Sequence, residues 1–345
     1  MPAKRRGQKS VVKAAEPSGD TMNIMWWPGV FGKIYASADK SRSPVEMWVA
    51  VTSHCAEIGE AIRSMNFSEL MRAAAHTFCW MCSFVLKCRS TDVLVFKVNE
   101  SFPSIVTAKY PDVCGHCLKN PCGCNPEEMD KHKDKAVRYR EIIDRRKELH
   151  ELPEQRSVSE WLNIFRRMYG HQIHLLTLES IGFHFLEEAG EELKALRALV
   201  QLKDAPDQLS GVDGTFLEQL ATFEGLVGLY GTYGGHEPDL TKRDPENIRN
   251  RLVRAKIEMF IEFADTFSWL CSIVNKVMAI AKNCDDGACQ FSQEPFPQWL
   301  QKVYLPQGKP LCPTCSKCPC ECVFYNEVST RAGAGGRSTK SGSLD

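Results

Sequence analysis

A cysteine pattern that occurs twice constrains this chain more than any other feature of the sequence. Both copies read C-x2-C-x4-C-x-C and contain Lys-x-Pro-Cys. The members are Cys114, Cys117, Cys122 and Cys124 in one copy and Cys312, Cys315, Cys320 and Cys322 in the other. Four thiolates at this spacing can enclose one tetrahedral Zn²⁺ and leave no open coordination position. We therefore predict two structural zinc sites, with an iron–sulfur cluster as the alternative.

The expected compartment supports a metal at these cysteines. The basic stretch Lys4–Arg6 is not followed by an apolar run, as it would be in a signal peptide. The sequence has no uncharged apolar window of about 18 residues, so we expect no membrane-spanning helix and no membrane partner. We expect a cytoplasmic protein, in which the 16 cysteines stay reduced and clustered cysteines bind metal.

Several residues near the clusters are given other roles. Cys318 is an extra thiol in the second cluster with no counterpart in the first, and it can substitute for a neighbouring ligand. His116 lies inside the first cluster, where we expect it beside the ligands rather than among them. Cys79, Cys82 and Cys271 fall on apolar helix faces and are predicted to be small core residues.

Three further matches precede the clusters in the same order and indicate a tandem duplication. Residues 30–35 resemble residues 164–169, Glu57-Ile-Gly-Glu60 resembles Glu188-Ala-Gly-Glu191, and residues 73–82 resemble residues 262–271. A collinear set of matches is the mark of an internal repeat rather than of coincidence. We place a first half at residues 22–125 and a second half at residues 158–325. The length of 345 residues predicts one core for each half.

Four segments lie outside the matched parts. Residues 1–21 form a basic tail and residues 326–345 a polar tail, and both are expected to be disordered. Residues 126–157 are dense in charge and predict an exposed connecting helix with a solvated face. Residues 203–250 are an insertion in the second half. Because Lys plus Arg and Asp plus Glu are both 43, no net charge draws the chain to nucleic acid.

Apolar periodicity predicts an all-α protein. Apolar residues recur at steps of three and four over residues 49–65, 69–87, 175–199 and 248–281, as on a helix with one buried face. Asp92–Val98 is the best candidate for a strand. We predict that helix pairs assemble into two related bundles, each ending in a small cysteine knuckle.

Two acidic pairs on these helices suggest a second kind of metal site. Glu188 with Glu191, and Glu262 with Asp265, are three residues apart, so each pair projects from one side of its helix. Such a pair usually lies on a solvated helix face. Apolar residues surround Glu262 and Asp265, however, and a buried carboxylate needs a partner. Oxygen ligands of this kind suit Mg²⁺ or Mn²⁺ bound together with substrate phosphates. Glu258 and His184 extend the same two faces.

These helices resemble the two characteristic helices of the MazG-like all-α nucleoside triphosphate pyrophosphohydrolases, an E-x-x-E helix followed by an E-x-x-D helix. The resemblance covers mainly the second half. It implies that Glu188, Glu191, Glu262 and Asp265 bind Mg²⁺, and that a nucleoside triphosphate and water give a monophosphate and pyrophosphate. The helices are about 70 residues apart, which is longer than the usual gap of the family, so the insertion is a candidate lid or specificity element.

The first half departs from the family pattern. Glu57 and Glu60 are present, but Ala73 and His76 stand where the second half has Glu262 and Asp265. We therefore expect the first half to be a scaffold without a metal pair. It would take the place of the second subunit of the dimer usual in the family, so that the protein is a pseudo-dimeric monomer or a homodimer of such chains.

The chemistry also requires a cation for the phosphates. Lys276, three turns after Asp265 on the same helix, is our first candidate, ahead of Lys194 and Arg197. A non-catalytic, zinc-stapled helical protein that binds a partner or a nucleotide is the alternative to a hydrolase. A non-canonical or alarmone-like nucleotide as the substrate is a third possibility that shares the same acidic site.

Overall fold

The computed structural model describes residues 22–90, 98–124, 135–149, 152–203, 212–234, 244–283 and 294–322. Its helices are α1 (Trp26–Ile34), α2 (Ala36–Ser41), α3 (Pro44–Arg63), α4 (Phe67–Ser90), α5 (Phe102–Thr107), α6 (Lys135–Lys147), η3 (Pro153–Gln155), α7 (Val158–Leu175), α8 (Leu178–Lys203), α10 (Gly214–Leu220), α11 (Phe223–Tyr233), α12 (Pro245–Asn283), α13 (Phe296–Tyr304) and η4 (Pro306–Gly308). Within these ranges no strand forms, so the predicted all-α class is confirmed. Both tails and residues 92–97 of the candidate strand lie outside the described residues.

Local sequence explains where several helices begin. Ser43 and Ser157 each accept a hydrogen bond from the backbone N–H three residues later, and the glutamate at that later position bonds back to the serine N–H. This reciprocal capping box satisfies two backbone donors at the start of α3 and of α7. Pro44 also occupies the first turn of α3, where its missing N–H removes no helical hydrogen bond.

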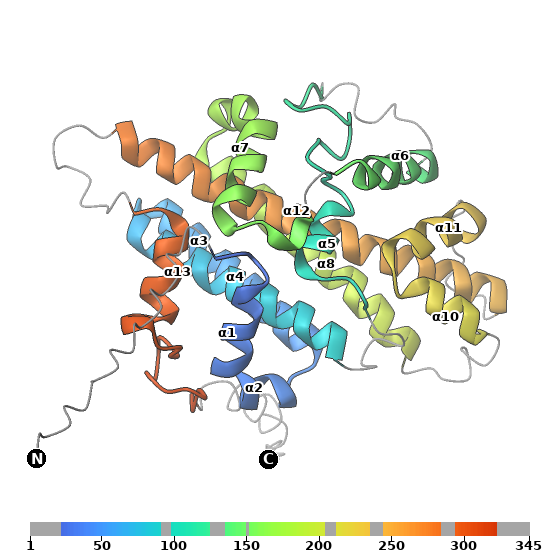
Figure 1. The fold of residues 1–345 in the computed structure, drawn as a ribbon, viewed down its shortest axis with the longest axis horizontal. Helices are drawn as coiled ribbons and strands as arrows, with labels where there is room; N and C mark the ends of the chain where they lie inside the picture. Colours follow the sequence, from blue (N-terminus) through green and yellow to red (C-terminus); the bar gives the residue numbers. More distant parts are fainter. Residues whose placement is uncertain are drawn as a thin grey trace, which may run out of the picture.

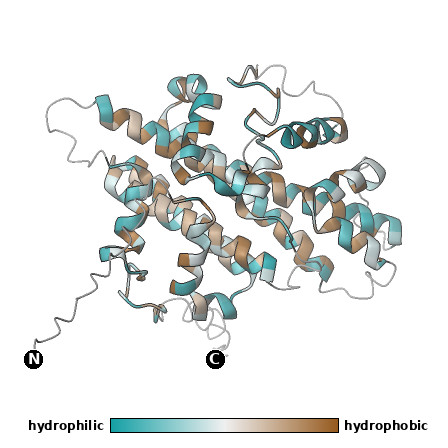
Figure 2. Ribbon diagram, in the orientation of Figure 1, coloured by the Kyte–Doolittle hydropathy of each residue, from teal (hydrophilic) through white to brown (hydrophobic). Residues whose placement is uncertain are grey.

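The four long helices α3, α4, α8 and α12 form the body of the molecule (Figure 1). Their apolar residues make one continuous core that includes both halves, with the apolar faces turned inward (Figure 2). Trp48 of α3 donates its indole N–H to the carbonyl of Ala189 in α8 at 2.8 Å, and its ring lies 5.8 Å from that of Phe263. The expectation of one core for each half was wrong, because α3 and α8 pack directly against each other.

The two halves contact each other in a reciprocal way. The Cys122 N–H in the first half donates to the Met168 carbonyl of α7 at 2.9 Å, and the Cys320 N–H in the second half donates to the Ile34 carbonyl of α1 at 2.6 Å. An isolated bridge joins Asn23 to Ser157 at the start of the two halves. Each cysteine cluster therefore packs on the entry helix of the opposite half.

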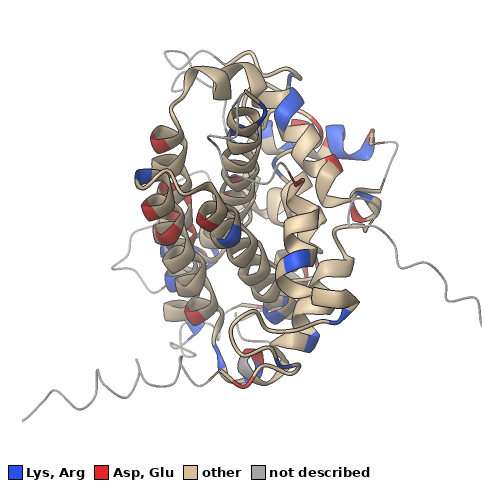
Figure 3. Ribbon diagram, turned by 90° about the vertical axis from the view of Figure 1, so that its left-hand side faces the viewer, with Lys and Arg blue, Asp and Glu red and all other residues tan. Residues whose placement is uncertain are grey.

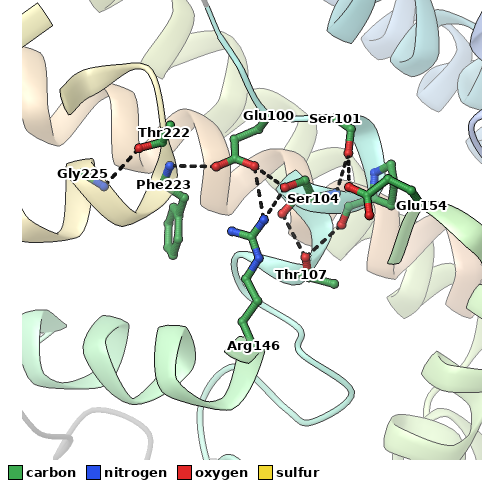
Figure 4. Close-up of polar contacts among 10 residues, drawn as sticks. Glu100, Ser101, Ser104, Thr107, Arg146, Glu154, Thr222, Phe223 and Gly225 are labelled. Atoms are coloured by element: carbon green, nitrogen blue, oxygen red, sulfur yellow. Dashed lines mark hydrogen bonds and ion pairs between the residues drawn. The ribbon is translucent and has the colours of Figure 1, made fainter. Parts of the chain in front are cut away.

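A polar junction holds the connecting segment and the insertion in place (Figure 4). The Glu100 carboxylate accepts the backbone N–H of Phe223 at the start of α11 (3.0 Å) and the guanidinium of Arg146 in α6 (3.2 Å). Arg146 also donates to the hydroxyl of Ser104. Since both Glu100 and Arg146 are largely buried, these charge-assisted hydrogen bonds fix α6 and α11 relative to α5.

Figure 3 shows charged residues of both signs on the outer helices at either side of the view. Across the described residues, no helix combines the length and the apolar character that crossing a membrane would require.

Candidate metal and phosphate site

Three carboxylates from two helices converge in the second half. Glu188 on α8 and Glu262 and Asp265 on α12 each offer an oxygen, and these oxygens all lie within 4.8 Å of one another. Asp265 is only 6% exposed, and Glu188 and Glu262 are half-buried. The i, i+3 spacing on α12 places its two acids on the side that faces α8. This arrangement can hold a metal ion, as predicted for these three residues.

Asp265 has two partners from the first half. The Lys109 ammonium donates to one of its carboxylate oxygens and the Tyr110 hydroxyl donates to the other. Lys109 is 7% exposed and Tyr110 is 5% exposed, so all three polar groups are shielded from water. Both partners follow α5, which packs against α12. The site is therefore built from both halves of the chain, a feature that their separation of about 155 residues in sequence concealed.

Two carboxyl groups of the cluster, those of Glu188 and Glu262, hold protons more strongly than isolated carboxyls do. Burial, a hydrogen bond to Glu188 and the charge of Asp265 together raise the pKa of Glu262 to about 9. Burial and the charge of Asp265 also raise the pKa of Glu188. Two carboxyl groups in hydrogen-bond contact must share a proton or a cation, because two carboxylates at that distance repel each other. The cluster therefore favours a positively charged partner.

A cavity of about 320 Å³ opens beside the acids. Glu191, Glu258 and Glu262 contribute acidic groups from α8 and α12. The basic groups around the cavity are those of Lys109, Lys135, Arg138 and Lys194. The volume is at the lower end of the range for small-molecule sites, about 300 to 1,000 Å³. A cavity lined by both acids and cations suits a polyanion bound together with a metal ion.

Helix α6 provides a wall of this cavity. Lys135, Arg138, Tyr139 and Ile142 line it, although we predicted only a solvated connecting helix there. Arg138 lies 3.3 Å from the ring nitrogen Nδ1 of His116, which joins α6 to the first cysteine cluster. A basic, weakly apolar helix has the same sequence pattern whether it faces solvent or a polar cavity. The composition of α6 therefore could not predict that this helix lines the cavity.

The predicted catalytic residues lie in three different places. Glu191 lines the cavity but does not belong to the group of three carboxylates. Lys194 also lines the cavity, whereas Arg197 lines a separate surface hollow beside Ser43. The prediction that Lys276 is the cation for the phosphates was wrong. Its ammonium donates to the carbonyls of Ile173 and His174 at the end of α7. Eleven residues of helix separate it from Asp265 by about 16 Å along the axis, so sharing a face did not bring the two together.

The corresponding place in the first half has no acidic cluster. His76 lies within 2.6 Å of the Tyr304 hydroxyl through Nδ1 and stacks on His54 with ring centroids 5.2 Å apart. Burial lowers the pKa of His76 to about 3, so the ring is neutral at neutral pH. Ala73 is buried and offers no ligand atom. At the two positions that correspond to Glu262 and Asp265, the first half therefore offers no carboxylate.

Both cysteine clusters have the geometry of a metal site. The Sγ atoms of Cys114 and Cys124 are 3.7 Å apart and those of Cys117 and Cys122 are 3.9 Å apart. The second cluster repeats these separations at 3.7 and 3.8 Å. Tetrahedral Zn²⁺ with Zn–S bonds of about 2.3 Å requires sulfur atoms about 3.8 Å apart. Each set of four thiols can therefore hold one metal ion, as predicted.

The other predicted roles near the clusters can also be compared. The Cys318 thiol is exposed, lies 3.5 Å from the Lys33 carbonyl and is outside the group of four. His116 lies outside the first group and lines the cavity instead. Cys79, Cys82 and Cys271 are buried in the core, as expected.

The raised pKa of Glu262 predicts a pH dependence of stability. Between the ordinary value of 4.5 and the folded value of about 9, the folded chain keeps a proton that the unfolded chain has lost. Stability should therefore fall as pH rises through this window in buffer without added divalent metal. Urea unfolding at several pH values should show a smaller decline for Glu262→Gln than for the wild type. Equal slopes for the two proteins would contradict the assignment.

Comparison with known proteins adds no relative: no family model matches the chain, and no curated protein or solved structure matches it at a significant level.

Proposed function

We propose that this protein is a MazG-like nucleoside triphosphate pyrophosphohydrolase that depends on Mg²⁺ or Mn²⁺. Its reaction would convert a nucleoside triphosphate and water into a nucleoside monophosphate and pyrophosphate. The observation that carries the proposal is the group of Glu188, Glu262 and Asp265 at the edge of a cavity with a basic wall. Acids that hold a metal and cations that hold phosphates are the two requirements of phosphoanhydride hydrolysis.

The donor set fits the proposed metal. Carboxylate oxygens suit hard cations such as Mg²⁺ and Mn²⁺, which bind with few protein ligands and with substrate phosphates. Glu188, Glu262 and Asp265 would hold the ion, and Glu191 lies on the same face of α8 toward the cavity. When bound, the ion would offset phosphate charge and lower the pKa of a water molecule. It would also replace the proton that Glu188 and Glu262 share.

The residues of the chain itself would bind and orient the substrate. Lys109, Lys135 and Arg138 line the cavity and would pair with phosphate oxygens, and Arg138 contacts His116. Tyr139 and Ile142 offer an apolar surface beside the cations for the nucleoside. Glu258 lies one turn before Glu262, and burial raises its pKa. It is our candidate for accepting a proton from the attacking water.

The reciprocal contacts support a fused, pseudo-dimeric arrangement. Tyr110 of the first half reaches Asp265, and Tyr304 of the second half reaches His76, the residue that corresponds to Asp265. Each half thus covers the acid position of the other, but only one of the two positions has kept its acid. In this proposal the first half acts as the second subunit, and the zinc-bound clusters attach each half to its neighbour.

The test is pyrophosphate release from a panel of ribo- and deoxynucleoside triphosphates, including modified bases and alarmone-like nucleotides, with Mg²⁺ or Mn²⁺. We expect equal amounts of monophosphate and pyrophosphate from the wild type. Glu191→Gln should reduce the rate about 10- to 100-fold, as for residues that support a metal site. Glu60→Gln, at the matching position of the first half, is the control and should leave the rate unchanged.

Two other results would each be decisive. A wild-type protein that binds two Zn²⁺ but releases no pyrophosphate from any nucleotide would favour the non-catalytic interaction protein. Equal losses in Glu191→Gln and Glu60→Gln would show that both halves act, and would remove the assignment of the site to the second half alone.

A further inference from the structure

The Lys109 ammonium lies where a metal ion would have to act. It donates directly to Asp265, and the charges of Glu262 and Glu188 also act on it. An ammonium in direct contact with a buried carboxylate is stabilised in its charged form. Asp265 is thus paired with an ammonium of this same chain, and a metal ligated by Asp265 must share it with that ammonium.

Two cations at one carboxylate repel each other strongly in a site shielded from water. Coulomb repulsion between charges about 4 Å apart is several times larger in a protein site than in bulk water. A divalent cation that is bound to Asp265 is therefore poorly compatible with the Lys109 ammonium in its present place. The lysine side chain has four flexible methylene groups, so its ammonium can move while its backbone stays in place.

The cavity beside Asp265 offers the Lys109 ammonium a second position. Lys109 lines the same cavity as Lys135 and Arg138, the residues proposed to bind phosphates. Tyr110 bonds to the other oxygen of Asp265, so that the carboxylate remains anchored when Lys109 leaves. Gly115 lies against the base of the lysine, since a Cβ there would be 2.8 Å from the Lys109 Cγ and carbonyl oxygen. The Lys109 Cε would lie only 3.4 Å from the same Cβ, so the missing side chain at Gly115 leaves room for the lysine along its length.

The two halves differ at the position of Lys109. Phe102-Pro103 through Tyr110 corresponds to Phe296-Pro297 through Tyr304, and this match places Val303 opposite Lys109. Tyr304 contacts His76 just as Tyr110 contacts Asp265. The tyrosine is thus present at both sites, whereas the lysine is present only where the acid is. This difference ties Lys109 to the acid cluster rather than to the packing of the segment.

We propose that Lys109 is a mobile counter-ion that alternates between Asp265 and the phosphates of the substrate. With no divalent cation at the acids, it neutralises Asp265. When the cation is bound, Lys109 turns into the cavity and pairs with the phosphate chain. The inference rests on the proposed function, since it assigns the substrate phosphates as the second partner, and it makes metal and substrate binding cooperative.

The test uses Lys109→Met, with binding of Mn²⁺ and of inorganic pyrophosphate as separate readouts. Mn²⁺ affinity, measured by electron paramagnetic resonance, should rise about tenfold because a competing cation is removed. Pyrophosphate affinity in the presence of Mn²⁺ should fall about tenfold because a phosphate partner is lost. A lysine with a structural role alone would weaken both. Lys109→Arg should stay close to the wild type in both, and Lys302→Met, at an exposed lysine of α13 outside the cavity lining, is the control for Mn²⁺ affinity.

A measurement on the wild type covers the case in which Lys109→Met does not fold. Labelling by an amine reagent, followed at Lys109 by mass spectrometry, should increase with Mn²⁺ and decrease again when pyrophosphate is added. Unchanged labelling, or an unchanged or weaker Mn²⁺ affinity in Lys109→Met, would overturn the inference. Both readouts are independent of catalysis. A wild type that hydrolyses no nucleotide but shows these shifts would therefore refute the proposed function alone.

Discussion

Replacing Glu262 by glutamine is expected to reduce pyrophosphate release on the order of 1,000-fold, the size of loss seen when one essential charge-stabilising group is removed. Glu262 belongs to the group of three carboxylates and shares a hydrogen bond with Glu188, so its charge acts at the centre of the site. Glutamine keeps the shape of the side chain but offers only a neutral oxygen. The variant should also lose most of the Mn²⁺ affinity of the acidic site.

The same substitution is expected to raise the melting temperature in buffer without added divalent metal. Burial and neighbouring acids make the ionised form of Glu262 costly, as its pKa of about 9 indicates. A neutral amide avoids this cost, which is a familiar trade between activity and stability at functional sites. Activity lost together with stability would instead mean that the carboxylate serves the fold.

Glu57→Gln is the matched control for Glu262→Gln. Glu57 occupies the first-half position that corresponds to Glu188 and accepts a hydrogen bond from His54 at 2.9 Å. Because His76 and Ala73 replace the other acids there, Glu57→Gln should change neither activity nor Mn²⁺ affinity. An activity loss of comparable size in this variant would contradict the assignment of one acidic site to the second half.

Loss of one cysteine ligand is expected to have the largest effect on stability. Structural Zn²⁺ contributes on the order of 10 kcal/mol of binding free energy in small zinc-binding domains, which is as large as the net stability of a typical domain. Cys122→Ser and Cys320→Ser should therefore each remove one of two zinc ions per chain and cause partial unfolding. Elemental analysis and thermal melting measure these effects.

The two cysteine variants should differ in their effect on the cavity. Gly115 and His116, next to the ligand Cys114, line the cavity, whereas the second cluster does not contribute to it. Cys122→Ser should therefore weaken pyrophosphate binding as well as stability, and Cys320→Ser should affect mainly stability. Cys318→Ser is the control, because this exposed thiol lies outside the group of four. A Cys122→Ser protein that still bound two zinc ions would refute the first site.

Features that depend on neighbours in the sequence were predicted from the sequence. The helical class, the long helices α3, α4, α8 and α12, and the two cysteine clusters follow from a 3.6-residue period and from short ligand spacings. The pairing of Glu262 with Asp265 follows from the same period. The sequence could predict these features because each one depends on residues only a few positions apart.

Only the tertiary structure decided which distant segments meet. The direct packing of α3 on α8 merges two expected cores into one, and each cysteine cluster packs on the opposite half. The cation at Asp265 is Lys109, about 155 residues away, and not Lys276 on the same helix. The wall of the cavity is α6, whose charge pattern is equally suited to solvent. Such contacts depend on how helices pack and on which polar groups burial forces together, and neither is encoded in local spacing.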